Sequence, residues 1–362
     1  MQKPSRRPGG QGLAYYPALT ALRGLFILSI VIFHIGDMFD RCFGQVLGIF
    51  YTYGGYLGNY FFFLLSGFLL GGSYREKIAA GHLSFFAFLR RRLIKIYPLY
   101  ILTNLYMLFL KICTHSLPAS GNWRTLLKVA LTTSWGWFDN VYPYNLPTWF
   151  VSILLQCWVV YYCVARLSAG RPALYRFLAE ALSLWGCLLI FLDIQAPFCY
   201  SQNGEGFLNF FLGVGLYEAF YSIQNAASAK TRRLAAGGAA LWVLLLCGVC
   251  GCCAHFLRSG SMAPAAVLLI CTTAIACALF LPPCRALLET PVLRRLGSIS
   301  ASVYFWHSPL AHMFIIVRNR VPLLGGLAPG AQFILYWILL PIVGWLSYCG
   351  IERPISGGRE RL

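Results

Sequence analysis

The stretch ALTALRGLFILSIVIFHIGDMF, residues 18–39, decides the class of this protein. It is about as long as a helix that crosses a lipid bilayer once, and it is apolar nearly throughout. It nevertheless carries Arg23 near one end and His34 near the other. Ionisable side chains at membrane depth are costly and are usually retained for function. We therefore interpret the stretch as a membrane-spanning helix that carries part of a functional site.

The spacing of Arg23 and His34 gives this helix a defined geometry. They are eleven positions apart, or roughly three helical turns, so both side chains fall within about 20° of one face, roughly 16 Å apart along the axis. Neutral imidazole accepts a proton near pH 7, so His34 is either a general base or a packing histidine. Asp37 either orients the imidazole or, as we favour, lies at the outer surface. Arg23 either belongs to the same site or is an interfacial anchor.

The composition extends the membrane interpretation to the whole chain. Its 362 residues are 59% hydrophobic and 11% charged, with a mean hydropathy of +0.66, whereas a soluble protein is nearer half apolar and a quarter charged. The formal net charge of +18 could indicate nucleic-acid binding. However, Lys and Arg lie between the hydrophobic runs, where the positive-inside rule places them. We expect an all-α, polytopic membrane helix bundle that contacts membrane lipids and no nucleic acid.

Ten hydrophobic runs are long enough to cross the bilayer. They are residues 18–39, 56–74, 94–113, 148–166, 174–192, 207–222, 234–256, 263–281, 299–317 and 333–351. A shorter run, residues 129–138, is too brief to span and is expected to be re-entrant or interfacial. If this run does not cross and the N-terminus is cytoplasmic, most basic residues between spans lie on the cytoplasmic side. The sequence therefore predicts about ten transmembrane helices with both termini in the cytoplasm.

The expected organisation is one transmembrane domain with two short tails. Residues 1–17 form a basic cytoplasmic tail, residues 18–354 the membrane domain and residues 355–362 a second cytoplasmic tail. The basic tail resembles the start of a signal peptide, but the first apolar run is too long and lacks a small-residue cleavage site, so we expect an uncleaved helix. Gly67 and Gly71, four residues apart, are expected to serve helix packing.

The cysteines are expected to be structural. Most of the fourteen lie inside apolar runs. The group Cys247, Cys250, Cys252 and Cys253 with His255 does not fit a common zinc spacing. We interpret these cysteines as small residues at a helix interface and expect no metal.

A basic block, FLRRRLIKIYPLY at residues 88–100, has two interpretations. Its cations could anchor the cytoplasmic end of a span and attract anionic lipid. Alternatively, Arg92 and Lys95 share a helix face and bind phosphate, since guanidinium pairs well with phosphate oxygens. On this stretch alone we favour the first interpretation.

Other polar residues of the spans are candidates for a substrate site. Ser66, in NYFFFLLSGFLL at residues 59–70, is a potential nucleophile without an adjacent base in the sequence. Two spans carry aromatic and hydrogen-bonding side chains that suit either a sugar-binding cavity or ordinary helix packing: Trp149, Ser152 and Gln156 in one, and Tyr304, Trp306 and His307 in the other.

Taken together, these blocks resemble the acyltransferase 3 family of integral membrane O-acyltransferases. Five blocks match in family order. They are LRG followed by FH at residues 22–34, FFFLLSGFLL at residues 61–70, the basic block ending in YP at residues 88–100, GSISASVYFWHSPL at residues 297–310, and ERP at residues 352–354. This order covers most of the chain, which makes the resemblance specific.

The resemblance implies an O-acyltransferase that moves an acyl group, often acetyl, from acyl-coenzyme A to a hydroxyl of a carbohydrate or lipid-linked glycan. It implies that His34 is catalytic and Arg23 its motif partner. It also implies that Arg92 and Lys95, with Arg91, bind the donor. Lys95 stands where the family has a second arginine, which keeps the charge but loses bidentate pairing. We assign the acceptor side to Ser66, Trp149, Tyr304, Trp306 and His307.

One feature of the family is missing from this sequence. The fourth-span block keeps Trp149 and Ser152 but lacks the family's two acidic residues, so we assign no carboxylate role there. We also expect no extracytoplasmic esterase-like domain of the kind that some members carry. We expect a multi-pass protein of the cell membrane, of the bacterial cytoplasmic type. The alternatives are a transporter or flippase that moves a lipid-linked glycan without acylating it, and a structural membrane subunit.

Overall fold

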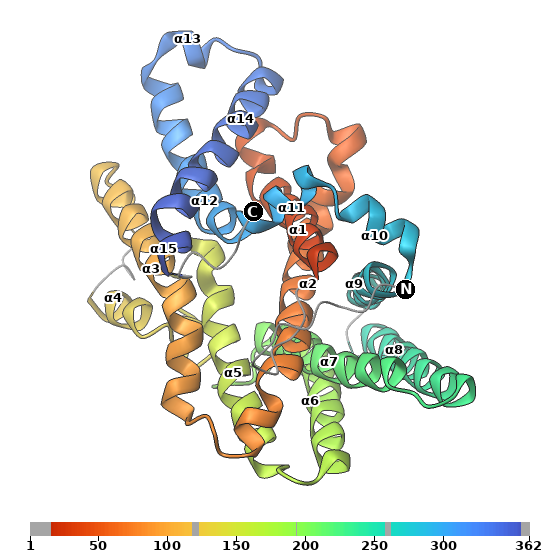
Figure 1. Cartoon of the computed structure of the whole chain (residues 1–362). Helices are drawn as coiled ribbons and strands as arrows, with labels where there is room; N and C mark the ends of the chain where they lie inside the picture. The colour runs from red at the N-terminus through yellow and green to blue at the C-terminus, as the bar shows by residue number, and fades with distance from the viewer. Residues whose placement is uncertain (1–15, 118–122, 193, 258–261, 356–362) are drawn as a thin grey trace. The chain divides into compact units, whose positions relative to one another are not determined.

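The computed structural model describes residues 16–117, 123–192, 194–257 and 262–355, and every regular element in these ranges is helical (Figure 1). The α-helices are α1 (Pro17–Ile35), α2 (Gly44–Ala79), α3 (Phe85–Cys113), α4 (Trp123–Ala130), α5 (Trp149–Leu167), α6 (Pro172–Leu192), α7 (Ser201–Gln224), α8 (Ala229–Phe256), α9 (Ala263–Phe280), α10 (Pro282–Leu288), α11 (Pro291–Ser298), α12 (Ser300–Arg320), α13 (Pro322–Gly325), α14 (Pro329–Ser347) and α15 (Arg353–Ile355). Short 3₁₀ turns occupy η1 (Gly36–Phe39) and η2 (Leu146–Thr148), and η3 (Tyr348–Glu352) is a π-helical turn. The expected all-α class is confirmed.

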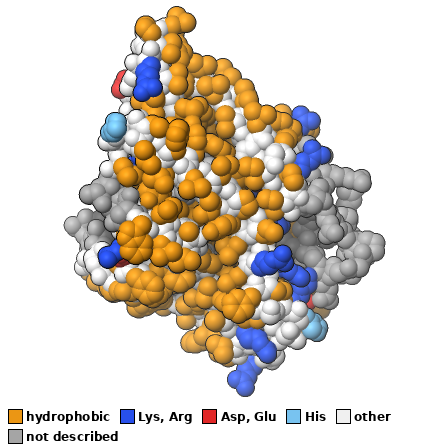
Figure 2. Space-filling model, turned by 90° about the vertical axis from the view of Figure 1, so that its left-hand side faces the viewer, with side chains coloured by type: hydrophobic (Ala, Val, Ile, Leu, Met, Phe, Trp, Pro, Cys, Tyr) orange, Lys and Arg blue, Asp and Glu red, His pale blue; other side chains and the backbone are white. Residues whose placement is uncertain are grey.

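Seven of the described helices are long and apolar enough to cross a membrane, which confirms a multi-pass membrane protein. They coincide with seven of the ten expected spans. The other three expected spans fall on α2 and α7, which contain several glycines, and on α12, which contains several polar side chains. Hydrophobic side chains cover most of the face in Figure 2, as lipid contact requires. Ten crossings and cytoplasmic termini stay predictions.

The run at residues 129–138 does not form a helix of its own. Helix α4 ends at Ala130, and the chain continues irregularly to η2. Thr132 and Gly136 adopt left-handed conformations in this segment, with φ of 55° and 77°. We call residues 131–148 the α4–α5 loop.

The described residues divide into two compact units. Unit 1 contains Asn59–Leu89 and Ile153–Leu279, and unit 2 contains Pro17–Gly58, Arg90–Ser152 and the chain from Phe280 onwards. Helices α2, α3 and α5 each contribute residues to both units. All the candidate site residues except Ser66 and Gln156 belong to unit 2.

Unit 1 is built on close helix contacts at glycine. Helix α7 packs on α6 and α2, where backbones touch because Gly186, Gly67 and Gly213 have no side chain. A Cβ on Gly67 would lie 1.8 Å from Phe210 O. The packing interpretation of Gly67 therefore agrees with the structure. An ion pair of 2.5 Å between Arg75 and Glu218 adds a polar link between α2 and α7.

Unit 2 is organised around α1, α11, α12 and α14. Helices α12 and α14 lie side by side and are joined through α13 (Figure 1). Helix α1 packs on α11 at Gly297, where an added Cβ would lie 1.8 Å from Thr20 O. The buried core of this unit includes Leu99, Tyr100 and Phe305. This packing fixes α1, which carries His34, against the short helix that leads directly into α12.

Candidate active site

Two histidines from different helices meet inside unit 2. The ring centroids of His34 on α1 and His307 on α12 lie 5.1 Å apart, with the rings tilted by 50°. His307 is fully buried, whereas His34 is half-buried. The sequence predicted a role for each histidine but gave no reason to expect them to be neighbours. The structure thus brings together the expected catalytic residue and one residue of the expected acceptor side.

Backbone hydrogen bonds define how each imidazole presents its second nitrogen. Nδ1 of His34 lies 2.9 Å from Ile30 O, and Nδ1 of His307 lies 2.6 Å from Tyr304 O. A carbonyl oxygen only accepts, so in both neutral rings Nδ1–H donates and Nε2 carries the lone pair. Nε2 of His307 is buried and has no hydrogen-bond partner among the described residues. Each ring can therefore accept a proton or a hydrogen bond at Nε2.

Asp37 does not orient His34. Its carboxylate pairs with Arg41, four residues later, at 2.7 Å, and both side chains are exposed. The alternative in which Asp37 acts as in a hydrolase triad is therefore wrong, and the surface interpretation holds. The hydrogen-bond partner that the structure shows for the His34 ring is a backbone carbonyl of its own helix.

Arg23 and His34 lie on one uninterrupted helix, which is the condition for their expected alignment. Arg23 is half-buried and takes part in none of the ion pairs between described residues. Its guanidinium therefore keeps its charge available for an anionic group.

The basic block lies on α3 within unit 2. Arg91 and Lys95 are exposed, and Arg92 is half-buried. The helix is continuous through this block and contains Pro98. Arg92 and Lys95 therefore share a face, as their i, i+3 spacing predicted.

The expected aromatic residues have identifiable partners. Tyr304 donates its hydroxyl hydrogen to Pro147 O, and its ring lies 5.9 Å from that of His307. Trp306 donates from Nε1 to Ser347 Oγ at 3.0 Å, and Trp149 packs on Phe150. Tyr304 is thus next to the histidine pair, while Trp306 contacts α14. Ser66 lies in unit 1, where its hydroxyl is buried without a described hydrogen-bond partner.

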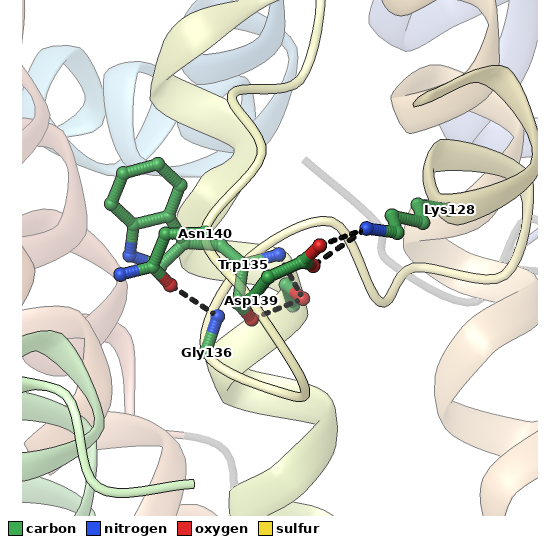
Figure 3. Close-up of polar contacts among 6 residues, drawn as sticks. Lys128, Trp135, Gly136, Asp139 and Asn140 are labelled. Atoms are coloured by element: carbon green, nitrogen blue, oxygen red, sulfur yellow. Dashed lines mark hydrogen bonds and ion pairs between the residues drawn. The ribbon is translucent and has the colours of Figure 1, made fainter. Parts of the chain in front are cut away.

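Polar contacts hold the first half of the α4–α5 loop to the two helices that flank it. Figure 3 shows Lys128 paired with Asp139, and Asn140 accepting a hydrogen bond from the Gly136 N–H at 2.9 Å. Ser152 on α5 donates to Trp135 O at 2.8 Å, which ties the loop to that helix. Ser152 therefore stabilises the loop.

Asn145, at the end of the same loop, was missed by the sequence analysis. It is fully buried and donates from Nδ2 to Phe305 O on α12 at 2.9 Å. The sequence does contain one signal for this contact. Pro309 follows Phe305 by four positions and removes the helical donor for that carbonyl.

A metal site is not seen in the described part of the chain, where no group of three or more His, Cys, Asp or Glu residues is arranged to hold an ion. Cys250 of the expected helix-interface group contacts a cysteine of another helix, whereas Cys252 is exposed. Sγ of Cys187 on α6 lies 3.1 Å from Sγ of Cys250 on α8, and both thiols are buried.

Comparison with known proteins identifies the class. A family model described as an acyltransferase domain, that of acyltransferase 3, matches residues 16–351. The chain therefore belongs to the acyltransferase 3 family and is a membrane acyltransferase. It is similar to acyltransferase MdmB of Streptomyces mycarofaciens, with 28% identity over 95% of this chain and 93% of that protein. No solved structure matches the chain. The resemblance noted in the sequence is thereby confirmed.

Proposed function

We propose that this acyltransferase uses acyl-coenzyme A, acetyl-coenzyme A in the simplest case, to acylate a hydroxyl of a carbohydrate or lipid-linked glycan at the cell membrane. The observation that carries the proposal is the contact between His34 and His307 within unit 2. Family membership favours this enzyme over a transporter that leaves its glycan unmodified. The proposed membrane domain is residues 18–354, with both termini and both tails in a bacterial cytoplasm.

The proposed chemistry is direct transfer with His34 as general base. Nε2 of His34 takes the proton of the acceptor hydroxyl, and the oxygen attacks the thioester carbonyl carbon. The carbon–sulfur bond breaks, and the coenzyme A thiolate recovers the proton from the imidazolium. The Nδ1–H bond to Ile30 O supports this role because it holds the tautomer with the lone pair on Nε2.

His307 gives a reason for a polyhydroxyl acceptor. Its Nε2 is buried with open hydrogen-bonding capacity, and an unpaired buried acceptor is unfavourable until a ligand fills it. A carbohydrate offers a second hydroxyl close to the one that reacts, and a simple alcohol does not. We propose that His307 accepts a hydrogen bond from this second hydroxyl, with Tyr304 beside it and Trp149 and Trp306 as further acceptor residues of unit 2.

The basic block is the proposed donor site. Coenzyme A carries phosphates, which Arg91, Arg92 and Lys95 on α3 would bind at the cytoplasmic surface. Arg23 adds a half-buried cation without an ion-pair partner among the described residues. Donor and acceptor would then reach the site from opposite sides of the membrane.

The two parts of this proposal can be separated with His34→Ala and Arg92→Ala. We expect His34→Ala to abolish incorporation of labelled acetyl groups into surface glycans while the purified protein still binds coenzyme A. We expect Arg92→Ala to weaken coenzyme A binding, measured by titration calorimetry, by about tenfold, which is the size of one charge-assisted hydrogen bond. His82→Ala and Arg320→Ala, both at exposed positions, are the matched controls. Retained transfer by His34→Ala would refute the proposed base.

A further inference from the structure

Helix α12 contains a carbonyl that the helix itself cannot satisfy. Pro309 lies inside the helix and has no N–H. In a regular α-helix the N–H of residue 309 would donate to the carbonyl of Phe305, four residues earlier. The missing bond falls on the turn that carries His307. A buried carbonyl left without a donor costs free energy comparable to a lost hydrogen bond.

Asn145 supplies the missing donor from another part of unit 2. Its Nδ2 lies 2.9 Å from Phe305 O and 3.2 Å from Thr103 Oγ1. Its own backbone N–H donates to Asn104 Oδ1 at 3.0 Å. Asn104 and Thr103 lie on α3 and are fully buried. Hydrogen bonds to α3 therefore hold both the backbone and the side chain of Asn145 while its Nδ2 donates to α12.

A second contact places the same loop against the same turn. Tyr304, next to Phe305, donates its hydroxyl hydrogen to Pro147 O. The Tyr304 carbonyl in turn accepts from Nδ1 of His307. Tyr336 of α14 donates its hydroxyl hydrogen to His307 O at 2.8 Å. The turn at residues 304–309 is thus held by groups outside α12 where its own helical bonding is interrupted.

We propose that Asn145 is a positioning residue for the acyltransferase reaction. It replaces the hydrogen bond that Pro309 removes and so holds the His307 ring against His34. The end of the α4–α5 loop and the histidine pair are then one coupled element. That Asn145 positions a reacting residue rests on the proposed function of His307. That Asn145 replaces the hydrogen bond missing at Phe305 O does not, and the experiment measures the two separately.

The test is a double-mutant cycle on the full-length protein with Asn145→Ala and Pro309→Ala. Residue 309 gains an N–H in Pro309→Ala, so Phe305 O no longer needs Asn145. We expect Asn145→Ala to raise amide hydrogen exchange in residues 303–312 by about tenfold, as for a buried acceptor left unpaired. We expect transfer from acetyl-coenzyme A to acceptor-containing membranes to lose about tenfold in kcat, with donor KM unchanged. Adding Pro309→Ala should recover most of both losses.

Asn140→Ala is the matched control, since it removes an asparagine amide of the same loop whose hydrogen bond among the described residues is to Gly136, also in the loop. It should leave exchange in residues 303–312 at the wild-type rate. The proposal would be overturned if Asn145→Ala and the double variant lost exchange protection and kcat equally. It would also be overturned if neither variant accumulated in the membrane. Suppose that the double variant recovers the wild-type exchange rate but His307→Ala leaves acyl transfer unchanged. The hydrogen bond from Asn145 to Phe305 O would then be supported, and the proposed function of His307 would be rejected.

Discussion

His307 combines features that an ordinary packing histidine does not need. It is fully buried, its Nδ1–H is engaged, and its Nε2 is left open beside a second imidazole. Two amide substitutions separate the roles of the two ring nitrogens. The longer side chain in His307→Gln would place an acceptor near the position of Nε2, and the shorter one in His307→Asn a donor near that of Nδ1. Activity should therefore distinguish the two variants.

We expect His307→Gln to retain at least about tenfold more acyl transfer to a carbohydrate acceptor than His307→Asn. The reason is that only His307→Gln can still accept the buried hydrogen bond from the acceptor hydroxyl. The measurement is kcat/KM for acetyl transfer in reconstituted membranes. His312→Asn is the control, because His312 also bonds a carbonyl of its own helix, Ser308 O, at 2.9 Å. If His307→Asn is the more active of the two variants, the acceptor role of Nε2 is wrong.

The sequence predicted the residue types of the site but not their partners. Arg23 and His34 were found because charge inside an apolar helix is unusual. Asp37 had two interpretations because helical spacing alone does not show that Arg41 takes its carboxylate. Asn145 was missed because it lies 160 positions before Phe305 in the chain, and its bond depends on how α3 and α12 pack.

At the scale of elements, the contact of α1 with α11 decides where His34 lies. Gly297 approaches Thr20 so closely that an added Cβ would lie 1.8 Å from a backbone oxygen, which cannot move as a flexible side chain could. We expect Gly297→Ala to destabilise the purified protein by about 1–3 kcal/mol, as overpacking does. Transfer should fall as well, because α1 and α12 would separate.

The control for this prediction is Gly237→Ala on α8, where nothing lies within 4 Å of an added Cβ. Alanine is the better helix former, so this substitution should be neutral or stabilise by about 0.5–1 kcal/mol. Thermal unfolding in one detergent measures both variants. Equal midpoints for Gly297→Ala and wild type would contradict the close approach of the two helices.

Helix α7, which hydropathy does not identify clearly as a membrane span, is largely buried by other helices. Helix α7 carries Asn203, Glu205 and Asn209, yet residues 203–214 are buried without interruption. Within unit 1 it contacts α2 at Gly67, α5 at Gly206 and α6 at Gly186. Its polar groups thus face protein rather than lipid, where they are tolerated at membrane depth. Periodicity and composition predict a span here only weakly, because they do not show which neighbours cover it.

At the scale of the whole molecule, the crossing of α7 decides the topology of everything that follows it. If α7 crosses, the segments before and after it lie on opposite membrane sides, and the basic residues 230–233 are cytoplasmic as the positive-inside rule requires. If it does not cross, those residues face outward. Since α7 is 24 residues long, it can span the roughly 30 Å hydrocarbon core at 1.5 Å per residue.

Epitope tags inserted after Gly170, Ala196 and Ala226 of the full-length protein test this directly, because the three segments precede α6, precede α7 and follow α7. We expect antibody to reach the tag after Ala196 in intact spheroplasts, and the other two only after permeabilisation. The tag after Gly170 is the control for cytoplasmic location, and transfer by each tagged protein shows that its fold is intact. Outside exposure of the tag after Ala226 would mean that α7 lies within the protein without crossing, and the proposed ten-span topology would then be wrong from α7 onwards.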